Sequence, residues 1–561
     1  MKVVIIGGVA GGATAAARIR RLDERAEIVM LERTGYVSYA NCGLPYYIGG
    51  EIADEEALTL QTPDSFFARY RVDVRVHSEA VAIDRAAKTV TVKDLSSGQT
   101  YLESYDKLLL SPGANAVIPP AARVRDGRVF TLRTVEDTFA IHDFVRAHAP
   151  GRAVVVGGGF IGLEVAENLM RQGIQVTLVQ RGEQVLAPLD ADMAAFLHSE
   201  LRRQGIDLRL GESLVSLEAE KVLAVCTDKG MYAADLAVIA VGVAPDTQLA
   251  RDAGLTLGQK GSIAVDAHMR TSDEHIYAVG DAVEIDHFVT GKRAVVALAG
   301  PANRQGRVAA DNICGIASEY RGAQASCVVR VFSLTAAATG INEKTARSLG
   351  ISYDKVVLSP ASHASYYPGA QVMTMKVLYE RDTNRLLGAQ IVGGDGVDKR
   401  IDVIATAMRA GLPAPALKDI DLAYAPPYSS AKDPVNMAGY MIENIVQGIV
   451  RQFHVEEADA LPRDGSVTLL DTRTPQEYAR GHAKGFVNIP LDELRARLGE
   501  VEKGKPVYVM CQSGLRSYLA CRILTQNGYD CYNFSGGYRF YDAVRRGGMS
   551  GRQSYPCGME K

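Results

Sequence analysis

Two copies of one pattern constrain the fold of this chain more than any other feature of its sequence. Each copy has a short apolar run, a glycine-rich turn, a helical pattern and a second apolar run. The first copy spans residues 2–31 and the second spans residues 153–179. This order is typical of strand–helix–strand units whose strands belong to one parallel sheet. The repeat therefore predicts an α/β fold with two Rossmann-like domains.

Composition argues against several classes of protein. The 561 residues are 47% hydrophobic and 23% charged, and no run of basic residues indicates a nucleic-acid or membrane partner. An apolar strand from residue 2 leaves no room for a signal peptide, and no apolar run approaches ~18 residues, so we expect a cytoplasmic protein. The 8 cysteines include no C-x-x-C pair, so we expect neither a disulfide framework nor a metal site.

The rest of the chain divides into two further regions. A strand at 372–379 and a helix at 398–410 belong to a pattern that predicts an α+β domain. Residues 446–462 have the composition of a linker. A fresh α/β unit follows, with apolar strands at 467–471 and 506–510.

The first glycine turn follows a strand and opens a helix, although Val9 holds the position of the middle glycine in G-x-G-x-x-G. Glycines let the backbone approach a pyrophosphate at a helix N-terminus, and Glu32 at the end of the next strand can bind a pair of ribose hydroxyls. A packing turn in an ordinary α/β domain is the alternative. The expected dinucleotide contacts are Gly7, Val9, Ala10, Gly11, Gly12, Glu32 and Arg33.

The second glycine turn fits the fingerprint fully, but the residue that ends its second strand is Gln180, followed by Arg181. An acid at this position would select NAD, whereas an arginine accepts the 2′-phosphate of NADP. The preference between NADH and NADPH stays open, and Phe160 is the candidate gate over the nicotinamide. The expected NAD(P) contacts are Gly157, Gly159, Phe160, Ile161, Gly162, Gln180 and Arg181.

A third segment, residues 271–281, ends in a strand followed by Gly280 and Asp281. It resembles the second FAD fingerprint of flavoproteins with two dinucleotide domains, where a strand delivers an aspartate to the ribityl–phosphate side of the flavin. Together with the two glycine turns, this resemblance predicts FAD as a cofactor.

The segment 38–47, Ser-Tyr-Ala-Asn-Cys-Gly-Leu-Pro-Tyr-Tyr, contains one cysteine, Cys42. Here the chain resembles the pyridine nucleotide–disulfide oxidoreductases, and most of all the coenzyme A disulfide reductases and the persulfide reductases with a fused rhodanese domain. Dithiol members of that class carry two cysteines five positions apart, whereas Ser38 stands where a second might have been. A single thiol forms no internal disulfide, so Cys42 must hold the outgoing sulfur as a mixed disulfide, a persulfide or a sulfenic acid. We expect the flavin and a nearby helix N-terminus to stabilise its thiolate.

NADH oxidases and peroxidases also use a single cysteine and are the rival class of enzyme. They typically place a histidine in the first glycine turn, close to the cysteine, and the matching residue here is Ala10. Without that general acid–base partner, sulfur chemistry is favoured over peroxide chemistry. A redox sensor or scaffold that signals through Cys42 oxidation is the non-enzymatic alternative.

The resemblance also implies residues around Cys42. Tyr366 and Tyr424 match tyrosines that such reductases supply from the partner subunit, which makes the active enzyme a homodimer; Tyr367 is an alternative to Tyr366, and packing at a dimer interface is the plainer role. Coenzyme A carries three phosphate groups and needs cations. The positions that match its contacts, or add to them, are Thr14, Arg18, Arg21, Ser38, Asn41, Asn303, Arg304 and Lys432.

The C-terminal unit has a signature of its own and resembles a single-domain rhodanese. Its central strand ends at Cys511, which begins a tight loop before a helix, where backbone N–H groups stabilise a thiolate and its persulfide. We expect Asp471 and Arg473 to support the fold, Cys521 and Cys531 to fill the core, and Cys557 to lie in an exposed tail. An inactive docking module is the alternative. The expected loop is Gln512, Ser513, Gly514, Leu515, Arg516 and Ser517.

The predicted fold class is α/β, with two Rossmann-like domains, an α+β dimerisation domain and a rhodanese domain. The expected boundaries are 1–112 and 246–320 for FAD, 113–245 for NAD(P)H, 321–445 for dimerisation, 446–462 for the linker and 463–561 for the rhodanese. The predicted activity is FAD- and NAD(P)H-dependent reduction of persulfides, polysulfides or disulfides of coenzyme A or another small thiol, with sulfane-sulfur transfer by Cys511.

Overall fold

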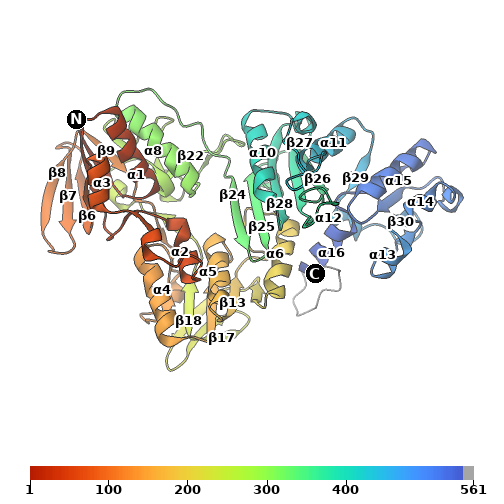
Figure 1. Cartoon of the computed structure of the whole chain (residues 1–561), viewed down its shortest axis with the longest axis horizontal. Helices are drawn as coiled ribbons and strands as arrows, with labels where there is room; N and C mark the ends of the chain where they lie inside the picture. The colour runs from red at the N-terminus through yellow and green to blue at the C-terminus, as the bar shows by residue number, and fades with distance from the viewer. Residues whose placement is uncertain (548–561) are drawn as a thin grey trace. The chain divides into compact units, whose positions relative to one another are not determined.

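The computed structural model describes residues 1–547, which fall into two compact units (Figure 1). The first unit contains Met1–Glu183 and Ile206–Ala325, and the second contains Gln184–Gly205 and the chain from Ser326 onward. No helix within residues 1–547 has the length and apolarity that crossing a bilayer requires.

The first unit opens with a five-stranded sheet in the order β21-β9-β1-β2-β5, in which every pairing is parallel. Val3, Val4 and Ile5 are fully buried, which explains why β1 has no polar alternation. Helix α1 (Ala10–Leu22) follows β1 and packs against α8 (Ala299–Ile313). The strands are β1 (Lys2–Ile6), β2 (Glu27–Leu31), β5 (Asp73–Arg75), β9 (Lys107–Leu110) and β21 (Ile276–Ala278).

A second parallel sheet in this unit has the order β11-β18-β12-β13-β14, with α5 (Phe160–Arg171) after its central strand. Both strand–helix–strand units predicted from the sequence are therefore confirmed. The strands are β11 (Val129–Phe130), β12 (Arg152–Val156), β13 (Gln175–Gln180), β14 (Asp207–Leu210) and β18 (Leu236–Ile239). Two antiparallel meanders also belong to the unit, β6 to β8 (Ser78–Asp84, Thr89–Asp94, Thr100–Ser104) and β15 to β17 (Leu214–Ala219, Leu223–Thr227, Met231–Ala234).

The second unit contains the predicted α+β region, a five-stranded antiparallel sheet in the order β24-β25-β28-β27-β26. Helix α10 (Val397–Arg409) packs on β25 and β28, and α11 (Pro434–Val446) packs on β26. Helix α6 (Ala191–Arg203) also belongs to this unit. The strands are β24 (Cys327–Val331), β25 (Leu334–Gly340), β26 (Tyr353–Leu358), β27 (Thr374–Glu380) and β28 (Leu386–Gly393).

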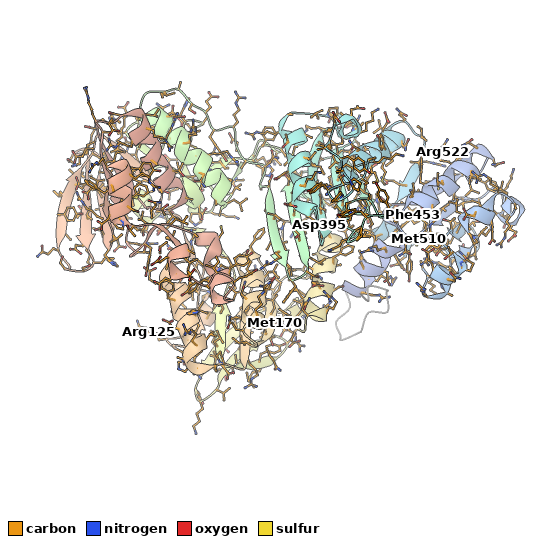
Figure 2. All side chains as sticks on the ribbon, viewed as in Figure 1. Arg125, Met170, Asp395, Phe453, Met510 and Arg522 are labelled. Atoms are coloured by element: carbon orange, nitrogen blue, oxygen red, sulfur yellow. The ribbon has the colours of Figure 1, made fainter. Side chains whose placement is uncertain are left out.

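The C-terminal sheet of the second unit differs from expectation at one edge. Its order is β29-β33-β32-β30-β31, and β29 (Arg451–Phe453) lies within the segment expected to be a linker. Three residues are too few to show a strand periodicity, so the sequence pattern missed them. Phe453 packs with Met510 in one buried cluster (Figure 2). The other strands are β30 (Thr468–Asp471), β31 (Val487–Asn488), β32 (Val507–Met510) and β33 (Cys531–Phe534).

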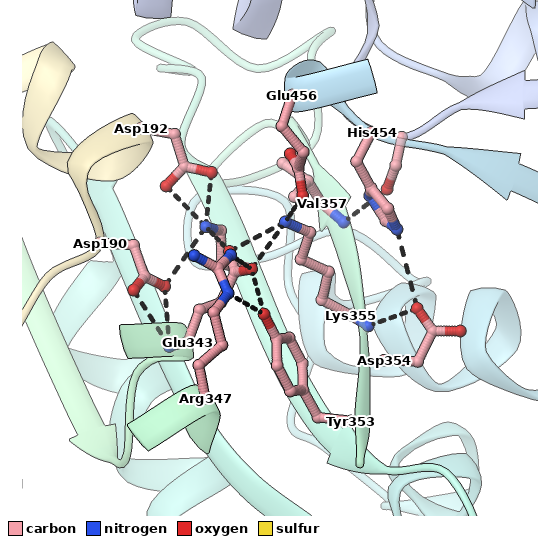
Figure 3. A network of polar contacts seen from close by, with 12 residues as sticks. Asp190, Asp192, Glu343, Arg347, Tyr353, Asp354, Lys355, Val357, His454 and Glu456 are labelled. Carbon is pink, nitrogen blue, oxygen red and sulfur yellow. Dashed lines mark hydrogen bonds and ion pairs between the residues drawn. The ribbon is translucent and has the colours of Figure 1, made fainter. Parts of the chain in front are cut away.

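The carboxylates of Asp190, Asp192 and Glu343 belong to a buried cluster of charges (Figure 3). The cation that contacts all three is Lys376, on β27. The Lys376 Nζ lies 2.5 Å from Asp192 Oδ2, 2.7 Å from Glu343 Oε1 and 3.4 Å from Asp190 Oδ2, and its side chain is fully buried. Burial alone would lower the pKa of Lys376, but the three carboxylates raise it above its ordinary value. These carboxylates lie close enough together to hold a metal ion. The ammonium group contacts all three and supplies the positive charge.

The cluster continues into the C-terminal region of the same unit. Lys355 Nζ lies 2.9 Å from Glu343 Oε2 and 2.7 Å from Glu456 Oε1, which belongs to α12 (Val455–Ala458) (Figure 3). The Val357 N–H on β26 donates to Ser535 Oγ at 3.0 Å. The antiparallel sheet and the C-terminal domain therefore share buried polar contacts, which require both surfaces to be in place.

Helix α6 carries a buried histidine, His198, whose two ring nitrogens have different partners. Nε2 accepts a hydrogen bond from the Val185 N–H at 3.2 Å, and Nδ1 lies 3.3 Å from the Gly547 carbonyl oxygen. Only the neutral ring protonated at Nδ1 satisfies both contacts. Burial, together with the charge of Arg202, lowers the pKa of His198 to about 4.

We expect this histidine to make the protein less stable in mild acid. The folded state keeps the ring neutral while the unfolded state binds a proton below its ordinary pKa, so the His198 contribution is complete above about pH 6.5 and is lost toward pH 4. Between pH 7 and pH 5 the wild type should lose about 2 kcal/mol more unfolding free energy than His198→Gln, whose amide does not titrate. Urea denaturation followed by circular dichroism measures this difference, and equal losses in the two proteins would contradict it.

Candidate active sites

The first glycine turn leaves the start of α1 open to a phosphate. Gly7 has a φ of 96°, and a Cβ added there would lie 2.1 Å from the Ser111 carbonyl oxygen. A Cβ at Gly12 would lie 1.9 Å from the Gly7 oxygen, so both positions require glycine. Among the described residues, no side chain caps α1, whose N-cap is Val9. The turn therefore fits the pyrophosphate of a dinucleotide despite its missing middle glycine.

The acidic residues predicted for this dinucleotide lie at strand ends. Glu32 Oε2 accepts the Gly8 N–H at 2.9 Å, which holds the carboxylate against the glycine turn. Asp281 follows β21 and forms an ion pair with Arg133 Nη2 at 2.9 Å. The Gly280 N–H donates to Gln305 Oε1 at 2.7 Å. Arg33 pairs instead with Asp246 at 2.9 Å, so its charge is partly engaged.

The second turn has the same architecture with an amide in place of the acid. Gly157 has a φ of 114°, and a Cβ at Gly162 would lie 1.8 Å from the Gly157 oxygen. Gln180 Oε1 accepts the Gly158 N–H at 2.9 Å, as Glu32 does for Gly8. This bond uses the amide oxygen of Gln180, which leaves its NH₂ group as the donor for a ribose oxygen or a phosphate. A Cβ at Gly159 would meet nothing within 4 Å, as expected where a ligand approaches the backbone.

Cys42 lies in a single 3₁₀ turn, Asn41–Gly43, directly before α2 (Leu44–Ile48), and its side chain is exposed in the single chain. The Asn41 amide faces Arg133, with its oxygen 3.0 Å from Nη1 when the amide is oriented to satisfy both groups. Arg133 thereby connects the cysteine turn to Asp281. Sequence reasoning missed Arg133 because an isolated arginine in a loop carries no motif.

The charged groups of the polypeptide around Cys42 have opposing effects on its thiol. Although Cys42 is exposed as a residue, neighbouring groups partly desolvate its sulfur, and this desolvation, followed by the carboxylates of Glu164 and Asp281, raises the pKa of the thiol, while Arg133 lowers it. Glu164, on α5, accepts a hydrogen bond from the Tyr46 hydroxyl at 3.1 Å. The polypeptide around Cys42 therefore favours the thiol, and Arg133 is the cation that opposes this effect.

The residues expected to contact coenzyme A in the first unit have different surroundings. Thr14 Oγ1 donates to Asn303 Oδ1 at 2.5 Å, which joins two predicted residues that are 289 positions apart. Arg18 is held by Asp311 at 2.7 Å, whereas Arg21 and Arg304 are exposed. Ser38 has a left-handed backbone, with a φ of 50°, and donates its N–H to the Gly8 oxygen at 2.8 Å.

In the second unit, Tyr366 and Tyr424 share a hydrogen bond between their hydroxyl oxygens, which are 2.8 Å apart. Both rings are exposed, at 74% and 46%. The bond to Tyr366 raises the pKa of Tyr424. Tyr367 instead lies edge-on to His363, with 5.7 Å between ring centroids. Lys432 is exposed in the same unit.

Cys511 is fully buried at the end of β32, beneath the loop that precedes α15 (Leu515–Gln526). Its sulfur accepts the Gly514 N–H at 3.1 Å and the Ser517 hydroxyl at 3.2 Å. Gly514 has a φ of 99°, which turns its N–H toward the sulfur. Such donors stabilise a thiolate and the terminal sulfur of a persulfide.

Two pairs of oppositely charged side chains stabilise the surroundings of the Cys511 loop. Asp471 and Arg473 are buried and paired at 2.8 Å, as expected for residues that support the fold, and Arg473 also donates to the Gly481 oxygen. Arg516 forms two 2.7 Å hydrogen bonds with Glu477. Cys521 and Cys531 are buried in the core, as expected. Cys557 lies outside the described residues.

Three protein-family models match successive regions of the chain. A model of the pyridine nucleotide-disulphide oxidoreductases matches residues 1–306, and a model of their dimerisation domain matches residues 326–434. A rhodanese-like domain model matches residues 454–543.

Similar proteins cover both the reductase region and the whole chain. A coenzyme A disulfide reductase from Staphylococcus aureus is 36% identical over 440 residues, which are 78% of this chain and 99% of the relative. The crystal structure of reduced Bacillus anthracis CoADR-RHD is 46% identical, with a TM-score of 0.94 over 97% of this chain and 98% of that one. The NAD-dependent persulfide reductase from A. fulgidus is 37% identical, with a TM-score of 0.91 over 96% and 100%. The chain therefore belongs to the pyridine nucleotide-disulphide oxidoreductase family, and it carries a rhodanese-like domain after its dimerisation domain.

Proposed function

We propose that this protein uses FAD and NAD(P)H to reduce the sulfur–sulfur bond of coenzyme A persulfides, polysulfides or disulfides, with Cys42 as the attacking thiol. The observation that carries the proposal is the single cysteine beside the first glycine turn, with Ser38 in place of a second thiol and Arg133 linking the turn to Asp281. The similar coenzyme A disulfide and persulfide reductases support the same class of substrate.

The Cys42 thiolate attacks one sulfur of R–S–S–R, so that a Cys42–S–S–R bond forms as the substrate S–S bond breaks and one thiolate leaves. For a persulfide, R–S–SH, the same attack places R–S on Cys42 and releases hydrosulfide. When bound at the first glycine turn, FAD reduced by NAD(P)H would supply the two electrons that break the Cys42–S–S–R bond, so that the Cys42 thiolate is restored and the second thiol leaves. The glycine turns at Gly7 and Gly157 hold the pyrophosphates of the two dinucleotides.

A phenol donates the proton that the departing thiolate needs. We assign this role to Tyr366 and Tyr424, which are 2.8 Å apart and can relay a proton between them. They act on Cys42 of the partner subunit in a homodimer, a role that the matching dimerisation domain supports.

The phosphates of coenzyme A require cations near Cys42. Arg21 and Arg304 are exposed and free to turn toward them, with Lys432 supplied by the partner subunit. Thr14 and Asn303 act as a hydrogen-bonded pair in the same site. Arg18, held by Asp311, contributes mainly by orienting α1 against α8.

The C-terminal domain handles sulfane sulfur. The Cys511 thiolate attacks a sulfane sulfur of a polysulfide, so that a Cys511–S–S bond forms as the polysulfide S–S bond breaks and the shortened polysulfide leaves. The Gly514 and Ser517 donors stabilise the persulfide, and the thiolate of coenzyme A or another small thiol then attacks its outer sulfur, which forms R–S–SH and restores the Cys511 thiolate. The full burial of Cys511 supports a small thiol as the acceptor, because a second protein thiol could not reach its sulfur without opening the loop.

Three further assignments concern the location of the protein, its use of NADH and NADPH, and the rival class of enzyme. The protein works in the cytoplasm, where NAD(P)H and coenzyme A are available. It uses both NADH and NADPH, since the Gln180 amide donates without repelling a 2′-phosphate and Arg181 follows it. Ala10 argues against an oxidase or peroxidase, because no histidine stands in the first turn as general acid–base partner.

Anaerobic oxidation of NADH and NADPH tests the proposal, with coenzyme A persulfide, coenzyme A disulfide and polysulfide as acceptors. We expect turnover with the persulfide, and a loss of polysulfide use in Cys511→Ser with little change for the disulfide. Cys521→Ser, which alters a buried thiol of the same domain, is the matched control. Fast oxygen-dependent oxidation without a sulfur acceptor would favour the oxidase, and no turnover with any acceptor would favour a sensor.

A further inference from the structure

A buried arginine lies behind the two loops that carry Tyr366 and Tyr424. One loop joins β26 to β27, and the other precedes α11. Arg400, on α10, is 1% exposed and is among the largest fully buried side chains. Among the described residues its Nε has no hydrogen-bond partner, so the contacts of Nη1 and Nη2 compensate for the burial of the charge and show what the side chain holds together.

The partners of Arg400 belong to both loops. Nη2 donates to the Ser362 carbonyl oxygen at 2.8 Å, in the loop of Tyr366. The same nitrogen lies 3.0 Å from Ser429 Oγ and 3.0 Å from Asp433 Oδ2, in the loop of Tyr424. Asp433 is 3% exposed and balances the charge. One guanidinium group therefore bridges two segments that are far apart in the sequence.

Ser429 makes a second connection between the loops. The Ala364 N–H donates to the Ser429 carbonyl oxygen at 2.9 Å, and the Ser429 hydroxyl donates to Asp433 Oδ2 at 2.6 Å. Asp433 Oδ1 accepts the Val435 N–H at 3.0 Å, which caps the start of α11. The backbone of each loop is thus held within a few residues of its tyrosine.

The tyrosine rings have little packing of their own to hold them in place. They are exposed, yet their hydroxyl oxygens are 2.8 Å apart. An exposed side chain is held at such a distance only if the backbones on both sides are fixed, because each ring has two free torsions. The buried contacts of Arg400 supply that restraint.

We propose that Arg400, through Ser429 and Asp433, is a positioning residue that keeps the phenols of Tyr366 and Tyr424 within hydrogen-bond distance for proton delivery. This inference rests on the function proposed above, because it requires that the phenol pair serves the reduction of a sulfur–sulfur bond. Arg400 itself touches no substrate.

The test uses the full-length, FAD-loaded protein with coenzyme A disulfide and NADPH. Ser429→Ala removes one hydroxyl from the buried contacts that Arg400, Ser429 and Asp433 make with one another, while keeping the Arg400–Asp433 pair. We expect kcat to fall about 10-fold with the KM for NADPH unchanged, because the phenols lose their alignment. Tyr424→Phe should lower kcat about 100-fold. In the Tyr424→Phe background, Ser429→Ala should have no further effect, since the group that it positions is gone.

Ser348→Ala is the matched control, because it removes a serine hydroxyl from α9 (Glu343–Ser348) in the same unit, away from both loops. Arg400→Lys is a second variant: it replaces the planar guanidinium group, whose Nη1 donates to Gly396 and whose Nη2 donates to both loops, with one ammonium group on a shorter side chain. We expect a loss at least as large as that of Ser429→Ala. If kcat is unchanged in Ser429→Ala and Arg400→Lys but falls in Tyr424→Phe, the positioning role alone is overturned. Additive losses of kcat in the double variant would overturn it too. A wild-type kcat in Tyr424→Phe would instead contradict the role of the phenols in the proposed function.

Discussion

Replacing Cys42 with serine is expected to lower the turnover of coenzyme A disulfide by about 1000-fold or more. A serine hydroxyl neither attacks the substrate sulfur at neutral pH nor forms a bond that two electrons can later break, so no path from FAD to the substrate remains. The NADPH site that we propose, at the Gly157 turn and Gln180, does not include Cys42. The change in FAD absorbance on anaerobic addition of NADPH should therefore keep its wild-type rate.

Stopped-flow absorbance measures both parts of this prediction in one experiment, with NADPH added first and coenzyme A disulfide second. Cys226→Ser is the matched control, because Cys226 lies on β16 of the same unit and has no assigned role. Turnover above about a tenth of the wild-type rate in Cys42→Ser would contradict its role as the attacking thiol. Slow FAD bleaching would show instead that the variant has damaged the nucleotide sites.

Replacing Lys376 with methionine is expected to have the largest effect on stability, a loss of about 3–5 kcal/mol in unfolding free energy. The ammonium group is fully buried and contacts Asp190, Asp192 and Glu343. Burial raises the pKa of Glu343, but Lys376 and Lys355 together hold it well below its usual range. Without Lys376, three carboxylates face one another with less positive charge among them.

A double variant separates this electrostatic cause from a loss of packing. Asp192→Asn should destabilise the wild type, but it should stabilise Lys376→Met because it removes one of the carboxylates left without its partner. Lys344→Met, at an exposed position on α9, is the matched control and should change stability by about 0.5 kcal/mol or less. The chain has no tryptophan, so urea denaturation is best followed by circular dichroism. Destabilisation by Asp192→Asn in both backgrounds would contradict the prediction.

Much of the fold could be predicted because buried parallel strands leave a strong pattern. The apolar runs at β1 and β12, each followed by glycines, fall where the structure places these strands. Strand β29 was missed because three residues cannot show a period, and its place in the sheet depends on pairing with β33, about 80 residues later.

The site residues that could be predicted are those that belong to local sequence motifs. The glycine turns and the Cys511 loop are local sequences whose chemistry depends on the backbone, so their residues could be named in advance. Arg133 and Arg400 could not, since each acts on segments remote in sequence: Arg133 on Asn41 and Asp281, and Arg400 on Ser362 and Ser429. Nothing in the residues next to these arginines distinguishes them from other arginines.

Strand β29 also bears on how the two halves of the gene could have been joined. The rhodanese-like match begins at residue 454, one residue after the edge strand ends at Phe453. A segment that began at residue 454 would lack β29, which would leave the N–H and C=O groups along one side of β33 unpaired. An open sheet edge of this kind pairs readily with other chains. The part of the chain that forms the complete C-terminal sheet is therefore longer than the matched region. Recombination that moves this sheet into another protein with its edge strand intact must break the gene upstream of Arg451.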